Sequence, residues 1–205
     1  VNSEAFADLF APIDEGKQKY IKAILESLHN LGVDLSMKEV MEEKRSTGYI
    51  GRFHIAKLMV KLGYGKTVEE IMDRYIGNYS PYYIPATSYI PYTSLEAVVE
   101  RIQAQSGFPI LAHPYSYHAL TEKETITLIS SFKETAGDTG GLEVYYLEYT
   151  KEQQESLRKL AKEYDLVPSV ASDRHRKEQP FSSYGGYSFY KEMLVRLENR
   201  KQEGK

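Results

Sequence analysis

Residues 108–122 read FPILAHPYSYHALTE, and residues 166–175 read LVPSVASDRH. Each stretch begins with a short apolar run and then reaches side chains that can bind a metal or transfer a proton. In the first stretch, His113 is followed at once by Pro114, which lacks the N–H needed to continue a strand ladder. In the second stretch, Asp173 and His175 follow the apolar run. The pattern predicts two short buried strands that end on polar side chains.

The surrounding sequence alternates between apolar runs and amphipathic segments. It predicts helices over residues 94–105, 121–134, 150–165 and 188–202, and strands over residues 108–112, 141–147 and 166–171. Short strands separated by longer helices are typical of βα units in a parallel sheet or barrel. A closed barrel needs about eight strands, so the three predicted strands make either an open parallel sheet or no more than half a barrel.

The N-terminal part has a different character. The spacing of its apolar residues predicts helices over residues 14–31, 34–43, 52–63 and 67–77. Ser36 with Glu39, and Thr67 with Glu70, form the spacing of capping boxes. Residues 78–93 are rich in proline and tyrosine, which excludes a regular helix. We therefore expect a small all-helical subdomain over residues 1–86 and an α/β body over residues 87–205.

The composition excludes several classes of protein. The 205 residues include no cysteine, so a disulfide framework and a thiolate metal site are both excluded. The net charge of −3 gives no sign of a nucleic-acid backbone as partner. We find no apolar run near the roughly 20 residues of a membrane span and no secretory leader. The cytoplasm is therefore the expected location.

Three side chains are candidates for a metal site. Functional residues gather at the carboxyl ends of parallel strands, so His113, Asp173 and His175 are expected to face one cavity. Imidazole nitrogens and carboxylate oxygens suit Zn, Mn or Fe, and such an ion lowers the pKa of bound water to about 7. Two alternatives stay open: Ser172–Asp173 as a helix N-cap, and His113 as a hydrogen-bonded turn residue.

Four segments, in this order along the chain, resemble the PHP (polymerase and histidinol phosphatase) family, in its branch of metal-dependent phosphoesterases with a helical insertion. They are GRFHIAKLMVKLGYGKTVEEIMDRYIG, GFPILAHP, GLEVY and ASDRH. The resemblance extends from about residue 14 to about residue 176. It implies the C-terminal part of a distorted (β/α)7 TIM-like barrel plus an inserted helical subdomain. It also implies two or three divalent ions (Mn, Zn or Fe) in a complete site.

The resemblance assigns residues as well. His113, Asp173 and His175 match the last three metal ligands of the family, and Arg52 and His54 match an element that approaches the substrate phosphate. Arginine can form a fork onto phosphate oxygens, although an Arg and a His early in a helix are also common as surface or capping residues. Glu143, in GLEVY, is expected to orient its neighbours. The resemblance names no further catalytic residue.

The chain departs from the family pattern in its histidines. The family opens with H-x-H, followed by further His and Glu ligands, and this sequence has no H-x-H. We therefore expect the chain alone to hold at most one ion, weakly, and a missing N-terminal segment to supply the other ligands. Arg174 also stands where relatives have an aromatic or small residue, and His118 is expected at the surface.

The function expected from this resemblance is hydrolysis of a phosphomonoester or nucleotide-type phosphoester by metal-bound hydroxide, once the N-terminal ligands are present. The expected partner is a phosphorylated small molecule or nucleotide. An alternative is an inactive PHP remnant that acts as a binding or assembly module, self-associating through an open sheet edge. A flavodoxin-like sheet that binds a phosphate ligand is weakened by the lack of a glycine-rich loop. The tyrosines from Tyr75 to Tyr92 could stack on bases or cover the seam between the two parts.

Overall fold

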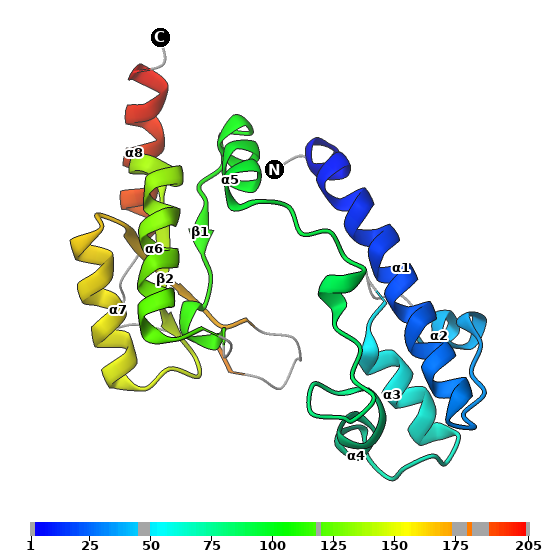
Figure 1. The fold of residues 1–205 in the computed structure, drawn as a ribbon. Helices are drawn as coiled ribbons and strands as arrows, with labels where there is room; N and C mark the ends of the chain where they lie inside the picture. The colour runs from blue at the N-terminus through cyan, green and yellow to red at the C-terminus, as the bar shows by residue number, and fades with distance from the viewer. Residues whose placement is uncertain (1–2, 45–49, 118–119, 174–179, 182–188, 204–205) are drawn as a thin grey trace. The chain divides into compact units, whose positions relative to one another are not determined.

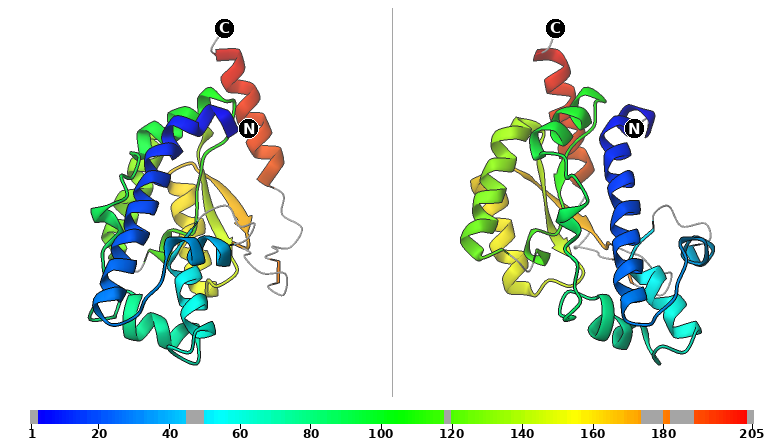
Figure 2. Two further views of the ribbon diagram at one scale, coloured as in Figure 1. Left: turned by 90° about the vertical axis from the view of Figure 1, so that its right-hand side faces the viewer. Right: turned by 45° about the vertical axis from the view of Figure 1, so that its right-hand side comes forward.

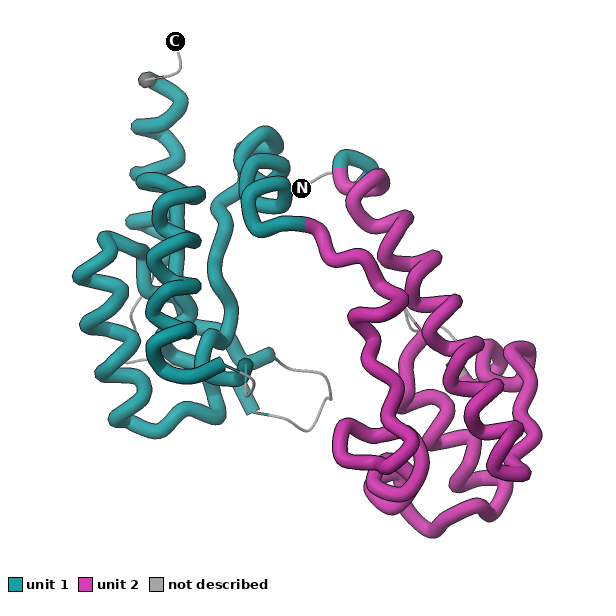
Figure 3. The backbone as a smooth tube through the Cα atoms, in the orientation of Figure 1, with its two compact units in different colours: residues 1–5, 94–205 teal, residues 6–93 magenta. Residues whose placement is uncertain are grey.

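The computed structural model describes residues 3–44, 50–117, 120–173, 180–181 and 189–203. The chain divides into a helical unit, residues 6–93, and a sheet unit, residues 1–5 and 94–205 (Figure 3). Each unit encloses its own apolar core. Within the described ranges, no helix has both the length and the apolar character needed to cross a membrane.

The helical unit is built from helices and short helical turns. They are α1 (Ala7–Asn30), α2 (Met37–Lys44), α3 (Arg52–Lys61), α4 (Val68–Ile71), the π-helical turn η2 (Met72–Ile76) and the 3₁₀ turn η3 (Ala86–Ser88). Their apolar faces enclose a core in which Ile21, Leu28, Ile55 and Met59 are fully buried. Helix stability here comes from this packing of one apolar face per helix.

The predicted helix starts are largely confirmed. The N–H of Glu39 donates to Oγ of Ser36 (3.2 Å), and the N–H of Glu70 donates to Oγ1 of Thr67 (3.1 Å). Helix α1 begins seven residues before the predicted start at Asp14, and Pro12 lies inside it. Proline has a helical φ and removes one intrahelical hydrogen bond, so α1 continues through Pro12.

The proline- and tyrosine-rich segment, residues 78–93, contains no regular helix beyond the single turn η3, as predicted. It runs back along α1, where Gly16 lies directly against its backbone. A Cβ at Gly16 would come within 2.6 Å of the carbonyl oxygen of Tyr89. Tyr20 fixes the same segment by donating its hydroxyl to the carbonyl of Ile84 at 3.0 Å.

The sheet unit contains three parallel strands in the order β1-β2-β3 (Figures 1 and 2). The strands are β1 (Ile110–Leu111), β2 (Gly141–Tyr146) and β3 (Val167–Ala171). The helices of this unit are α5 (Leu95–Ala104), α6 (Glu122–Ala136), α7 (Lys151–Glu163) and α8 (Phe189–Glu203). The order of helices and strands confirms a mixed α/β unit with a small parallel sheet.

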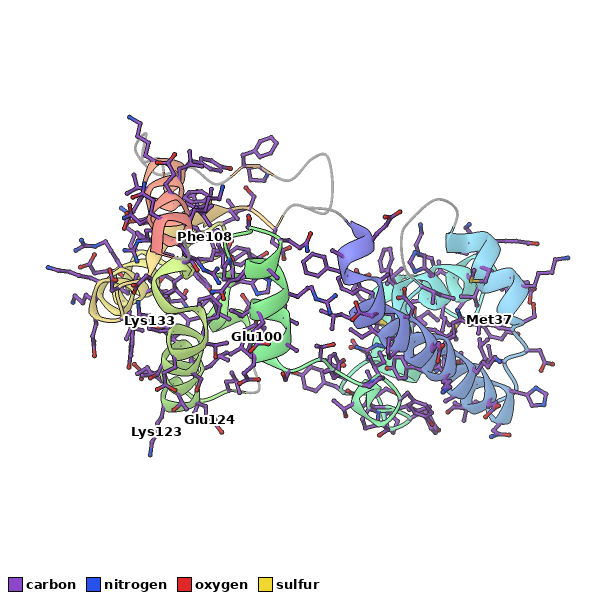
Figure 4. The ribbon with its side chains drawn as sticks, turned by 90° about the horizontal axis from the view of Figure 1, so that it is seen from above. Met37, Glu100, Phe108, Lys123, Glu124 and Lys133 are labelled. Atoms are coloured by element: carbon purple, nitrogen blue, oxygen red, sulfur yellow. The ribbon has the colours of Figure 1, made fainter. Side chains whose placement is uncertain are left out.

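The central strand organises this unit. Every residue of β2 is buried, α7 packs on β2, and α8 packs on β3. Helix α6 begins at a capping box in which Thr121 and Glu124 bond reciprocally, and Figure 4 labels Glu124 beside Lys123 in the first turn. Strand β1 is shorter than predicted, because Pro109 has no N–H to donate and contributes only its carbonyl, to the N–H of Gly141 at 2.9 Å.

Candidate functional site

His113 and Asp173 lie at the same edge of the sheet. His113 follows the end of β1 and Asp173 follows the end of β3, and both strands run parallel to β2 between them. The register pairs Leu111 with Leu142, and Ala171 with Tyr146. Both candidate ligands therefore stand at the carboxyl edge, where parallel α/β folds place functional groups.

Glu143 anchors His113 from the central strand. Its side chain is only 2% exposed, and Oε2 accepts a 2.5 Å hydrogen bond from the backbone N–H of His113. Burial raises the pKa of Glu143; the N–H and the charge of His113 oppose this, and the charge of Asp173 adds to it. This hydrogen bond bears out the prediction that Glu143 orients its neighbours. The register of β2 against β3 shifts between Glu143 and Tyr145, and such irregularities are common beside active sites.

The His113 imidazole packs against two aromatic rings. Its centroid lies 5.7 Å from the ring of Tyr117 and 5.6 Å from the ring of Tyr146. Nδ1 is buried and has no hydrogen-bond partner among the described residues. A buried nitrogen without a partner costs free energy, so this atom is one that a bound cation would satisfy.

Tyr146 connects the two candidate ligands. Its ring packs against His113, and its hydroxyl donates a hydrogen bond to the carboxylate of Asp173. Burial is the largest cause of a raised pKa for Tyr146, and the charges of Glu148, Asp173 and Glu143 raise it further. Sequence reasoning missed Tyr146, although the rule that selected His113 and Asp173, a polar group at a strand's carboxyl end, applies equally to the last residue of β2.

Both candidate ligands have left-handed backbone conformations. The φ angle is +27° at His113 and +42° at Asp173. The other described non-glycine residues with positive φ, Ser106 and Asp165, lie in the turns that follow α5 and α7, where such angles are ordinary. At the ends of β1 and β3, positive φ angles cost conformational free energy, and residues strained in this way are concentrated at functional sites.

A tyrosine cluster (Tyr115, Tyr117, Tyr146 and Tyr149) adjoins His113, with Tyr117 and Tyr146 in contact with the imidazole. The Tyr146 and Tyr149 rings lie 5.1 Å apart, and the Tyr115 and Tyr149 rings 5.8 Å apart. The hydroxyl of Tyr149 accepts the backbone N–H of Tyr115 at 2.9 Å. Burial raises the pKa of Tyr149 to about 12, against the opposing effect of that N–H. The contacts between Tyr115 and Tyr149 tie the loop after β1 to the segment after β2.

The placed donors fit a cation only in part. One imidazole and one carboxylate stand at the edge, and these ligand types suit Zn, Mn or Fe. His175, the third predicted ligand, and His118 lie outside the described residues. Among the residues that the structure describes, no group of three or more His, Asp or Glu side chains could hold an ion.

Arg52 and His54 lie at the start of α3, in the helical unit. Nη1 of Arg52 donates to the carbonyl of Ile76 (3.0 Å) and to Oδ1 of Asn78 (2.9 Å). Nδ1 of His54 accepts the N–H of Gly51 at 3.2 Å. His54 thus accepts a backbone N–H at the start of α3, and Arg52 donates to a backbone carbonyl at the end of η2. Such capping contacts are the alternative role that we considered for these two residues from the sequence.

Comparisons with known proteins identify relatives along most of the chain. No family model matches. A 5'-3' exoribonuclease from Haemophilus influenzae is 34% identical over 128 residues, 62% of this chain and 44% of that protein. The 5'-3' exoribonuclease Rnm of Salmonella typhimurium is 24% identical over 172 residues, 84% of this chain and 56% of that protein. The chain therefore spans about half the length of the curated relatives it matches.

Two solved structures resemble the fold. A protein assigned as a metal-dependent phosphoesterase from Bifidobacterium adolescentis aligns with a TM-score of 0.69 at 24% identity, covering 95% of this chain and 68% of that one. An amidohydrolase from Chromobacterium violaceum, solved with bound sulfate and no metal, aligns with a TM-score of 0.73 at 23% identity. It covers 94% of this chain and 67% of that one. The chain thus shares its fold with these two proteins over nearly its whole length.

Proposed function

We propose that this chain carries part of a PHP-type, metal-dependent phosphoesterase that hydrolyses a phosphomonoester or a nucleotide-type phosphoester. The observation that carries the proposal is the arrangement of His113 and Asp173 about Glu143 and Tyr146 at the carboxyl edge of the sheet. The names of the relatives, exoribonucleases and a phosphoesterase, support a phosphate ester as substrate. The proposal includes the C-terminal part of a TIM-like barrel, a helical cap, and a cytoplasmic location.

The proposed metal ligands are His113, Asp173 and His175. A divalent ion bound there would supply a water of lowered pKa, about 7, as nucleophile. Three donors suffice for one ion with open positions, so the proposal assigns this chain at most one weakly held ion. The further ligands of a complete site would come from a complementing segment.

The residues around the ligands have separate tasks in this proposal. Glu143 fixes the backbone of His113 and so aims the imidazole, while Tyr146 holds the carboxylate of Asp173 with its hydroxyl. Ligands fixed in this way lose less conformational entropy on binding, and such supporting hydrogen bonds raise metal affinity. The rings of Tyr117 and Tyr146 contact the imidazole and help to bury it.

Arg52 and His54 are proposed to contact the substrate phosphate from the cap. Arg52 donates to Ile76 and Asn78 through Nη1. Among the residues that the structure describes, Nη2 and Nε donate no hydrogen bond, so both are proposed as donors to phosphate oxygens. The sulfate bound in the Chromobacterium violaceum protein supports an oxyanion site in this fold.

The proposal is tested on the complete protein with metal analysis and an aryl phosphate. We expect bound Mn, Zn or Fe, and hydrolysis that stops on chelation and returns when the ion is restored. The variants His113→Ala and Asp173→Asn should lose both the ion and the activity, while the exposed-site variant Tyr79→Ala should keep both. A complete protein that binds no divalent ion would overturn the proposal.

A further inference from the structure

A cavity of about 500 Å³ adjoins the candidate metal centre. It lies between the loop after β1 and the first turns of α6 and α7. Its lining residues are Tyr115, Tyr117, Leu120, Glu122, Thr125, Glu152, Gln153 and Ser156. Small-molecule sites usually have volumes of about 300–1,000 Å³. Tyr117 joins the cavity to the candidate metal centre, because it lines the cavity and its ring centroid lies 5.7 Å from that of His113.

The walls of the cavity combine aromatic and acidic groups. The ring of Tyr117 is 39% exposed, and the hydroxyl of Tyr115 is paired with Oγ of Ser156 at 2.9 Å, which fixes that wall. Glu122 and Glu152 contribute carboxylates, and no Lys or Arg is among the described residues of the lining. A phosphate group is therefore disfavoured here by charge. A flat neutral ring that carries N–H donors suits these walls.

Gln153 adds a directional group. Its Oε1 already accepts the backbone N–H of Thr150 at 2.9 Å, in the capping box of α7. The amide Nε2 has no hydrogen bond within the described part of the chain, so Gln153 offers the cavity a donor. The lining thus provides an aromatic face, a donor and two carboxylate acceptors, which together match the face and the polar edge of a nucleobase.

We infer that this cavity is the nucleobase subsite of the substrate whose phosphate binds at the His113 and Asp173 edge. The inference rests on the proposed function and narrows its substrate class to nucleotides. The base stacks on Tyr117, its exocyclic amino group donates to a carboxylate of Glu122 or Glu152, and the phosphate stays on the metal side of Tyr117. The acidic lining keeps the two ends of the nucleotide in this orientation.

Calorimetric titration of the complete, metal-free protein with AMP and with ribose 5-phosphate tests the inference, because neither phosphomonoester is hydrolysed by the proposed function without the ion. We expect the wild type to bind AMP about ten-fold more tightly, because stacking on an aromatic side chain contributes on that scale. Tyr117→Ala, and separately Ser156→Phe, which fills the cavity from α7 without touching His113, should bring the ratio of the two affinities close to one. Tyr117→Phe should retain the ratio, and Lys38→Ala, at a highly exposed position of α2 in the helical unit, should leave it unchanged.

The outcomes separate this inference from the function itself. A wild type that hydrolyses an aryl phosphate but binds AMP no better than ribose 5-phosphate overturns the subsite and leaves the phosphoesterase standing. AMP binding that depends on Tyr117, in a protein that hydrolyses no phosphate ester, supports the subsite and overturns the function. Tighter binding of choline phosphate than of AMP would show a site for cations and also overturn the nucleobase assignment.

Discussion

The backbone N–H of His113 donates a 2.5 Å hydrogen bond to Oε2 of Glu143, a carboxylate buried in the middle of the central strand. This bond joins the end of β1 to β2 beyond the short ladder of the two strands. It also holds His113 at a φ of +27°, an angle that a non-glycine residue adopts only at a cost. A buried polar group in β2 thus determines the backbone from which the candidate ligand projects.

Glu143→Ala is expected to lower the free energy of unfolding by about 2–4 kcal/mol, since it leaves a cavity and an unpaired buried N–H. Glu143→Gln keeps an acceptor of the same shape and should cost less than half as much. Urea denaturation measures both. Glu134→Ala, at an exposed position of α6, is the matched control and should change stability by no more than about 0.5 kcal/mol. Equal midpoints for wild type and Glu143→Ala would refute the anchoring role.

Tyr146→Phe removes one hydroxyl and keeps the ring against His113. If Asp173 binds a divalent ion, loss of the hydrogen bond that orients its carboxylate should weaken Mn²⁺ binding by roughly 10–100-fold. Calorimetric titration of the metal-free complete protein gives the affinity directly. Tyr92→Phe, on an exposed ring of the helical unit, should bind the ion as the wild type does. An unchanged affinity in Tyr146→Phe would remove Tyr146 from the metal site.

The sequence could predict those features that depend on local pattern. A polar residue directly after a short apolar run identified His113 and Asp173, and the parallel order of the strands followed from the helices between them. The same rule would have selected Tyr146 at the end of β2, but its hydrogen bond to Asp173 could not be predicted, because that bond joins residues of different strands and depends on their register. The contacts of Arg52 also could not be predicted, because its acceptors lie far along the chain, on Ile76 at the end of η2 and on Asn78 just after it. The length of β1 depended on which backbone groups pair with β2, where Pro109 contributes a carbonyl and no N–H.

Arg52→Ala should destabilise the helical unit by about 1–3 kcal/mol, because the carbonyl of Ile76 and the side chain of Asn78 lose a charged donor. Arg52→Lys keeps the positive charge but lacks the planar guanidinium that reaches both acceptors, so it should recover part of the lost stability. Chemical denaturation followed by circular dichroism reports the change, since this unit is helical. Lys38→Ala, at a highly exposed position of α2, is the control. If Arg52→Ala is as stable as the control, the hydrogen bonds of Arg52 to Ile76 and Asn78 do not stabilise the fold.

Gly16→Ala provides a test in which two effects have opposite signs. In an unobstructed helix, this change would stabilise by roughly 1 kcal/mol through helix propensity. In α1, however, the new Cβ would approach the backbone of Tyr89 and Ile90 to 2.6 Å and 2.8 Å. Backbone atoms cannot move aside cheaply, so we expect net destabilisation of about 1–3 kcal/mol. A rise in the thermal midpoint would show that residues 78–93 do not pack on α1 in this way.

Arg196 attaches α8 to the turn before β3, and this contact should depend on pH. The guanidinium donates to the carboxylate of Asp165 at 2.8 Å and to the backbone carbonyl of the same residue at 3.0 Å. Burial alone would raise the pKa of Asp165, but the hydrogen bonds and charge of Arg196 outweigh it and leave that pKa below its usual value. A carboxyl with a lowered folded-state pKa contributes stability above its unfolded pKa of about 3.9, and this contribution is lost as the pH falls through the lower folded value.

Arg196→Ala should therefore cost about 1–2 kcal/mol at pH 7, a modest figure because the Asp165 carboxyl is largely exposed to solvent. The difference from the wild type should shrink as the pH falls from about 5 toward 2, because Asp165 of the variant keeps only its pairing with Lys133 and its pKa returns toward the ordinary value. Urea midpoints across that range measure the difference. Arg158→Ala, which breaks an exposed pair with Glu155 on α7, should show a small effect at every pH. A gap between wild type and Arg196→Ala that stays constant with pH would mean that the backbone contacts of Arg196, and not its pairing with Asp165, hold α8 in place.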